Sequence, residues 1–179
     1  MDNGTVTNVV FAGLGGQGVL KASDILSDAA FMAGFDVKKS EIHGMSQRGG
    51  SVTSDVRYGP RVYSPMVPAG ESDFLVALDG MQVAPARHFL KEDGVLIVPE
   101  LLLKEGQDLD DLETDPSTPI TKRGLNVALL GVLSVYLDLP ESCWRAALRN
   151  NLPPKTHAVN DKIFEFGRAA GMTHSVSRP

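Results

Sequence analysis

Hydrophobic positions in the first forty residues change from a strand-like to a helix-like spacing at a glycine-rich turn. Residues 6–12 read VTNVVFA, a nearly continuous apolar run rich in β-branched side chains, which is typical of a strand buried on both faces of a sheet. Beyond the turn, apolar residues recur at helical spacing from Val19 to Ala33, and Gly34 stands where a helix would end. The pattern predicts a strand, a tight turn and a helix, followed by a second strand over residues 35–38.

The middle of the chain carries further strand-like runs. Residues 51–57 alternate, and the turn YGPR separates them from the run at 62–67, so we expect a β-hairpin there. Residues 74–78 and 95–98 are short buried-strand runs, with a helix predicted over residues 81–90 between them. This order of strand, helix and strand is typical of an α/β domain.

The last third of the chain is predicted to be helical. We expect helices over residues 125–137, 141–149 and 155–170, the last of them ending at Gly171. The first of these helices is apolar on all sides, so it must be covered from more than one direction. Residues 99–119 are acidic and punctuated by proline, which favours a solvated surface excursion over an interaction segment.

Together these elements predict one α/β domain over residues 1–179. Its sheet is Rossmann-like, mixed and mostly parallel, with flanking helices, one β-hairpin and a helical C-terminal third. A chain of 179 residues is long enough to bury the core that such a sheet needs. Residues 172–179 are expected to form a flexible tail.

Composition and charge exclude several classes of protein. The chain has 17 Lys and Arg against 22 Asp and Glu, a net charge of -5, and so offers no basic surface for nucleic acid. Without a long apolar run or a signal peptide, we expect a cytoplasmic protein with no membrane contact. The single cysteine, Cys143, cannot form an internal disulfide or hold an iron–sulfur cluster alone, because such clusters usually take four thiolates. We therefore predict no metal site in this chain.

The turn GLGGQG is the first candidate for chemistry. It matches G-x-G-x-x-G between a predicted strand and a predicted helix, where backbone N–H groups at the helix N-terminus can bind phosphate. The alternative is that the glycines only allow the helix to pack closely on the strand. A nicotinamide dinucleotide would also need an acid about 20 residues beyond the turn, and Glu41 is the nearest, though late, match. The candidate binding residues here are Gly13, Gly15, Gly16, Gln17 and Gly18.

The segment at residues 39–51 is a second candidate, because it is dense in glycines and hydrogen-bonding side chains. Arg48 could present its planar guanidinium, together with neighbouring amides, to a carboxylate or phosphate. Lys38 and Lys39 suit an extra phosphate, as in coenzyme A, or serve only solubility. His43 is a candidate general base, with a hydrogen-bonded structural role as the alternative. The candidate binding residues here are Lys38, Lys39, Ser46, Gln47, Arg48, Gly49 and Gly50.

Two stretches in the first half of the chain are specific enough to suggest a family. They read GLGGQGVLKASDILSDAAFMAGFDVKKSEIHGMSQRGGSVTSDVRYG and VYSPMVPAGESDFLVAL. Both resemble the gamma-type domain of 2-oxoacid:ferredoxin oxidoreductases. Within that family, HGMSQRGGSV resembles the beta subunit of the indolepyruvate branch more than the pyruvate branch.

The resemblance implies a larger enzyme that decarboxylates a 2-oxoacid, an aryl pyruvate in this branch, and releases an acyl-CoA while ferredoxin accepts the electrons. An alpha subunit would hold thiamine diphosphate, its Mg ion and 4Fe-4S clusters, so this chain is expected to be the non-cofactor subunit and inactive alone. The resemblance also implies that the gamma-type domain helps to form the coenzyme A site. Two alternatives remain open: a stand-alone nucleotide-dependent oxidoreductase, and a nucleotide-sensing module.

Overall fold

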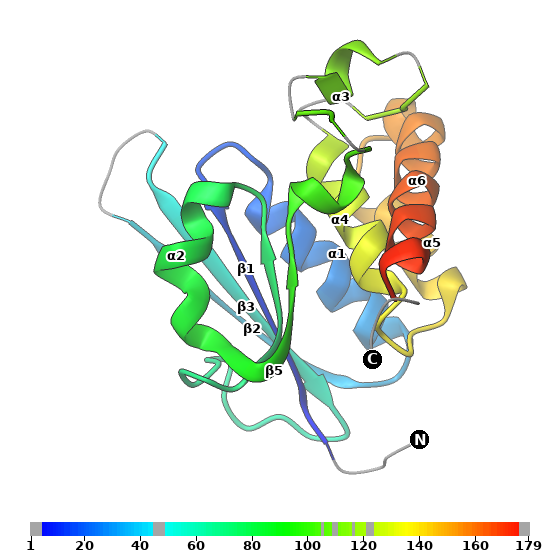
Figure 1. Cartoon of the computed structure of the whole chain (residues 1–179). Helices are drawn as coiled ribbons and strands as arrows, with labels where there is room; N and C mark the ends of the chain where they lie inside the picture. Colours follow the sequence, from blue (N-terminus) through cyan, green and yellow to red (C-terminus); the bar gives the residue numbers. More distant parts are fainter. Residues whose placement is uncertain are drawn as a thin grey trace.

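A mixed five-stranded sheet forms the centre of the molecule. The computed structural model describes residues 5–44, 49–104, 106–108, 111–115, 117–120 and 124–175. The strands lie in the order β2-β3-β1-β4-β5, and all run in one direction except β3 (Figure 1). Their bounds are β1 Thr7–Leu14, β2 Asp36–His43, β3 Ser51–Gly59, β4 Ser72–Ala77 and β5 Leu90–Ile97. The predicted α/β class with a mixed, mostly parallel sheet is confirmed.

Helices cover the two faces of the sheet unequally. Four helices lie on one side, namely α1 (Val19–Met32), α4 (Leu125–Ser134), α5 (Glu141–Asn151) and α6 (His157–Ser175), whereas the short α2 (Val83–Ala86) lies on the other (Figure 1). The remaining turns of helix are η1 (Gly80–Gln82), η2 (Arg87–Phe89), η3 (Pro99–Leu102), α3 (Asp111–Thr114) and η5 (Pro154–Thr156). None of the helices in the described part of the chain is long and apolar enough to cross a membrane.

The alternation of side chains along β1 divides the core between the two faces. Val9 and Phe11 belong to the larger core, which lies against α1 and α4. Val10 and Ala12 point the opposite way, into a smaller core that includes Leu75 of β4. Because both faces of β1 are buried, its sequence is continuously apolar, as the strand pattern predicts.

Helix α4 is the centre of the larger core. Every residue from 126 to 134 is buried, which confirms that this apolar helix is covered from more than one direction. Its backbone lies close to that of α6, because a Cβ added to Gly167 would lie 1.9 Å from the Ala128 carbonyl oxygen. On the opposite helix, a Cβ at Gly131 would lie 2.3 Å from the Phe164 carbonyl oxygen. These glycines are therefore required by packing.

The β-hairpin lies elsewhere than the sequence pattern predicts. Strands β2 and β3 form it, and residues 62–67 belong to no strand. Both edges of β3 are already paired, with β1 and β2, so no position remains there for another strand. Side chains of β3 hold the segment instead: Asp55 Oδ2 accepts from the Val67 backbone N–H at 2.9 Å, and Arg57 donates to two carbonyls of the segment.

Several other predicted boundaries were wrong. The helix expected over residues 81–90 is broken into two 3₁₀ turns flanking the four-residue α2, and β5 already begins at its end. Helix α6 continues past Gly171 to Ser175. Gly171 serves packing and does not end the helix, since a Cβ added to it would lie 3.0 Å from the backbone of Val132. Of the predicted flexible tail, residues 172–175 are therefore helical and residues 176–179 lie outside the described part.

The acidic segment is more than a surface excursion. Its acidic side chains include the exposed Glu100 and Asp111, but Leu102 and Leu112 are buried in the larger core, as is Ile120 directly after the segment. The segment therefore covers the helix layer with its apolar residues. Its exposed carboxylates face solvent, whereas that of Asp115, whose side chain is 18% exposed, is held by Lys104 and Gln107. The assignment of all 179 residues to one domain stays a prediction.

Candidate functional site

The glycine turn lies at the carboxyl end of β1, where α/β sheets bind ligands. Gly16 and Gly18 have positive φ values of 94° and 83°, which non-glycine residues rarely adopt. Gly18 is the N-cap of α1, and neither a side-chain cap nor an acidic residue occupies the first turn of that helix. Since the first N–H groups of a helix have no intrahelical partner, this end of α1 can receive an anion.

Some glycines of the turn are required by close packing, whereas another leaves its backbone open to a ligand. A Cβ at Gly13 would lie 2.7 Å from Val19 Cγ2, and one at Gly18 would lie 2.5 Å from Asn126 Nδ2, so packing explains both. Gly16 is different, because among the described residues, its chain neighbours aside, nothing lies within 4 Å of an added Cβ. Its surroundings are open, and a ligand can approach its backbone.

The second glycine segment docks directly on the first. The Gly15 N–H donates to the Gly50 carbonyl at 2.9 Å, and a Cβ on Gly15 would lie 3.7 Å from the Gly49 nitrogen. Gly49 also has a positive φ, 68°, and a Cβ added to it would meet none of the described residues beyond its chain neighbours within 4 Å. The structure thus brings together Gly13, Gly15, Gly16, Gln17, Gly18, Gly49 and Gly50 from the predicted set. The predicted residues Ser46, Gln47 and Arg48 lie outside the described residues.

Gln17 fixes the shape of the turn through both ends of its amide. Its Oε1 accepts from the Leu14 N–H at 2.7 Å, and its Nε2 donates to Asp79 Oδ2 at 2.9 Å. The other oxygen of Asp79 accepts from the Met81 N–H at 2.9 Å. Gln17 therefore ties the end of β1 to the segment that follows β4.

Two residues at this site were not in the predicted set. Asp79 follows the end of β4, which is parallel to β1, so the rule that ligands bind at the carboxyl ends of parallel strands could have identified it. Asn126 is 6% exposed and its Nδ2 donates to the Gly18 carbonyl at 3.2 Å. In the sequence, Asn126 could have been identified only as a polar residue at the start of an apolar helix.

Lys38 and Lys39 do not lie at the turn. The register places Lys38 opposite Arg57 and Asn8, six residues before Leu14, which corresponds to about 20 Å along the sheet. Lys38 pairs with Asp36 at 2.9 Å. The Val62 N–H and then Lys38 both stabilise the ionised form of Asp36 and lower its pKa.

Lys39 faces α1 and is engaged by two carboxylates. Its Nζ lies 2.5 Å from Asp24 Oδ1 and 2.5 Å from Glu41 Oε1. Burial disfavours its charge, but these two hydrogen bonds outweigh burial, so the pKa of Lys39 is raised. The hydrogen bond from Lys39 is the main cause that lowers the pKa of Glu41. Neither lysine is free to neutralise a phosphate at the turn.

The position of Glu41 disfavours a nicotinamide dinucleotide site. β3 lies between β1 and β2, so Glu41 stands two strands away from the glycine turn. Its carboxylate is also committed to Lys39, and its second oxygen lies 3.6 Å from His43 Nε2. The acid that would hold the ribose in a dinucleotide fold is therefore not beside the turn.

His43 is level with Gly13 in the register but two strands away, about 10 Å across the sheet. Its side chain is 56% exposed and faces Glu41, a geometry that fits an edge-strand ion pair when the imidazole is protonated. Among the described residues, no three His, Cys, Asp or Glu side chains are grouped so that they could hold a metal ion. The chemistry that this arrangement itself supports is the binding of an anion.

The fold and this site define an α/β domain in which a glycine turn at the N-terminus of a helix is completed by a docked glycine loop. The chain belongs to the pyruvate ferredoxin/flavodoxin oxidoreductase family, whose model matches residues 8–170. The family resemblance seen in the first half of the sequence is confirmed, and it extends over most of the chain.

Named relatives match over nearly their whole length. The indolepyruvate oxidoreductase subunit IorB of Thermococcus kodakarensis is 32% identical over 191 residues, covering 89% of this chain and 93% of the relative. The pyruvate/ketoisovalerate oxidoreductases common subunit gamma of Pyrococcus abyssi is 34% identical over 174 residues, covering 87% of this chain and 94% of the relative.

Two solved structures share the fold. The gamma subunit of a keto/oxoacid ferredoxin oxidoreductase from Geobacter sulfurreducens has a TM-score of 0.75 at 24% identity, covering 93% of this chain and 99% of that one. The 2-oxoglutarate:ferredoxin oxidoreductase of Magnetococcus marinus, solved with 2-oxoglutarate, coenzyme A and succinyl-CoA bound, has a TM-score of 0.78 at 18% identity. This second match covers 95% of this chain and 32% of that one.

Proposed function

We propose that this chain is the non-cofactor subunit of an indolepyruvate-type 2-oxoacid:ferredoxin oxidoreductase. The observation that carries this proposal is the match to the IorB subunit over 89% of the chain at 32% identity. The complex would convert an aryl pyruvate to an acyl-CoA in the cytoplasm and pass the electrons to ferredoxin. The chain alone would be inactive.

The glycine turn would contribute to the coenzyme A site of that complex. Its fit to an anion rests on the open backbone at Gly16, the uncapped N-terminus of α1 and the adjacent open backbone at Gly49. Coenzyme A supplies the thiol that accepts the acyl group. The residues of this chain would bind a phosphate group through backbone amides, and Gln17 and Asp79 would keep those amides oriented.

An alpha subunit would carry thiamine diphosphate with its Mg ion and the 4Fe-4S clusters. This division of labour is what the family resemblance implies, and the amino-acid inventory agrees with it, because the chain has one cysteine, Cys143, and such clusters usually take four thiolates. The described residues also bring no carboxylate group together for a metal ion. The alpha subunit is therefore the partner that the proposal requires.

The test is to purify the chain with its large subunit from the native host and measure reduction of a low-potential dye. We expect coenzyme A-dependent reduction by the complex, with kcat/KM for indolepyruvate at least about tenfold above that for pyruvate or 2-oxoglutarate. The chain alone should show none. Equal use of pyruvate would overturn the substrate assignment. Reduction of NAD by the isolated chain would favour the stand-alone oxidoreductase instead.

A further inference from the structure

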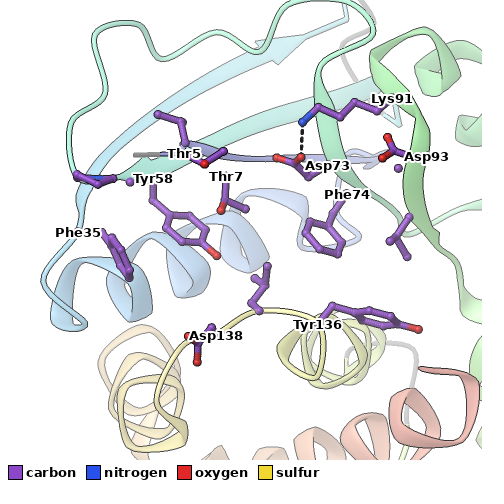
Figure 2. Close-up of a pocket in the computed structure, with 16 residues that line it drawn as sticks. Thr5, Thr7, Phe35, Tyr58, Asp73, Phe74, Lys91, Asp93, Tyr136 and Asp138 are labelled. Carbon is purple, nitrogen blue, oxygen red and sulfur yellow. Dashed lines mark hydrogen bonds and ion pairs between the residues drawn. The ribbon is translucent and has the colours of Figure 1, made fainter. Parts of the chain in front are cut away.

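A cavity lies at the end of the sheet opposite the glycine turn. It has a volume of about 470 Å³ and opens between the amino ends of β1 and β4 and the connection from α4 to α5 (Figure 2). Pockets that hold small molecules typically have volumes of about 300–1,000 Å³. None of the candidate residues of the glycine turn lines this cavity.

Two pairs of aromatic side chains form walls of the cavity. Phe35 and Tyr58 have ring centroids 5.4 Å apart, and Phe74 and Tyr136 have centroids 6.1 Å apart. Figure 2 shows the two pairs on either side of the space, with Asp138 below them. Three of these rings are only half-buried, so aromatic surface remains open to a ligand.

The end of α1 positions one of these rings. Gly34 adopts a φ of 93°, its N–H donates to the Phe31 carbonyl at 3.0 Å, and the Phe35 N–H donates to the Ala30 carbonyl at 3.1 Å. This pair of hydrogen bonds is a Schellman motif, which ends the helix and turns the next side chain back toward it. Phe35 is therefore held in place by the backbone, and the wall is preformed.

The charges around the cavity are predominantly negative. Among the described residues that line the cavity, Lys91 is the only cation. It is paired with Asp73, which also accepts from the Asn8 N–H at 2.7 Å. Asp93 and Asp138 also line the cavity, and no described residue forms an ion pair with either. Burial, opposed by a hydrogen bond with Thr7 and aided by the charges of Asp73 and Asp138, raises the pKa of Tyr58 to about 12.

We propose that this cavity binds a small organic cation, a primary ammonium carried on an aromatic body. The ammonium would lie at the exposed carboxylate of Asp138, and the ring between the two aromatic pairs, with Asp93 adding negative charge from the other side of the cavity. An ammonium over an aromatic face is favourable, whereas an anionic ligand would meet two uncompensated carboxylates. The inference does not depend on the proposed function, because it uses other residues at the other end of the sheet.

The probe is 2-phenylethylammonium, titrated into the full chain by calorimetry. We expect a Kd of about 1 mM or tighter. The neutral analogue 2-phenylethanol should bind at least about tenfold more weakly, and the anionic 3-phenylpropanoate should not bind measurably. Equal binding of the alcohol, or no binding of the ammonium, overturns the proposal.

Variants locate the binding. Asp138→Asn should weaken ammonium binding about tenfold, since it removes the carboxylate that faces the ammonium. The matched control is Glu92→Gln, an exposed acid adjacent to Asp93 that does not line the cavity, and it should leave binding unchanged. Phe35→Leu keeps an apolar residue after the Schellman motif and should weaken binding about threefold to tenfold through loss of the aromatic face. Thermal unfolding of each variant checks that it is folded, and unchanged binding by folded Asp138→Asn overturns the assignment.

Discussion

Single residues at positive φ differ in what surrounds them, and Gly16 offers the sharpest test of the anion site. Gly16→Ala places a methyl group where no atom of the described residues, apart from its chain neighbours, lies within 4 Å, so it should cost only the left-handed backbone strain, about 1–2 kcal/mol. If a phosphate binds there, the KM for coenzyme A in the assembled enzyme should rise about tenfold, and calorimetric affinity for coenzyme A should fall equally. The control is Gly70→Ala, which has a φ of 75° and the same open surroundings. Equal kinetic effects of both variants would contradict the site.

Gln17 should act on the shape of the same turn. Gln17→Glu keeps an acceptor for the Leu14 N–H but replaces the donor to Asp79 with a like charge. We expect a loss of stability of about 1–3 kcal/mol at neutral pH, measured by urea denaturation. Asp79→Asn in the Gln17→Glu background should recover part of that loss, because it restores a donor opposite the new carboxylate. No recovery would mean that the pair does not tie the turn.

Tyr58 should make stability depend on alkaline pH. Burial raises its pKa to about 12 from 10. A raised pKa in the folded state means that the contribution of the neutral phenol is complete below pH 10 and is lost as the pH rises to about 12. The loss should be about 2–3 kcal/mol by chemical denaturation at successive pH values. Tyr58→Phe should abolish it, whereas Tyr63→Phe, at an 84% exposed residue, should retain it.

At the scale of elements, the backbones of α4 and α6 approach each other closely at Gly167. Gly167→Ala would place a Cβ 1.9 Å from the Ala128 carbonyl oxygen, and backbone cannot yield as a flexible side chain can. We expect a loss of about 3 kcal/mol despite the better helix propensity of alanine, measured by chemical denaturation. Ala169→Ser, on the exposed face of α6, should change stability by less than about 0.5 kcal/mol. A stable Gly167→Ala protein would refute this account of the helix pair.

The elements that sequence predicted best are those fixed by local pattern. The strand at β1, the helix α1 with its stop at Gly34, and the buried helix α4 all follow from periodicity and glycine chemistry. The pairing of β3 could not be predicted in this way, because the choice between β2 and residues 62–67 depends on long-range competition for its edges. Long-range pairing limits prediction of the site as well. Glycine spacing identified the turn, but the distance between Lys38 and the turn depends on strand order, which the local sequence does not determine.

For the whole molecule, the amino-acid inventory predicts a chain that carries no iron. Purified alone, it should be colourless, because its one thiol, on the half-buried Cys143, cannot supply the four ligands that a cluster usually takes. Iron and sulfide analysis with visible absorbance checks this. A brown preparation with stoichiometric iron and sulfide would refute it, and would also remove the need for a cluster-bearing partner. The purified complex, in contrast, should absorb in the visible range.

The place of β2 at the edge of the sheet has a consequence for aggregation. In the part of the chain that the structure describes, no strand pairs with its outer backbone groups, so they could template the addition of a strand from another molecule. β2 reads DVKKSEIH, with Asp36 and Lys38 on one face and Lys39 and Glu41 on the other. A second copy of the strand would have to bury or oppose these charges on both faces. Lys38 and Lys39, predicted from the sequence to suit a phosphate, therefore disfavour extension of the sheet into a fibre.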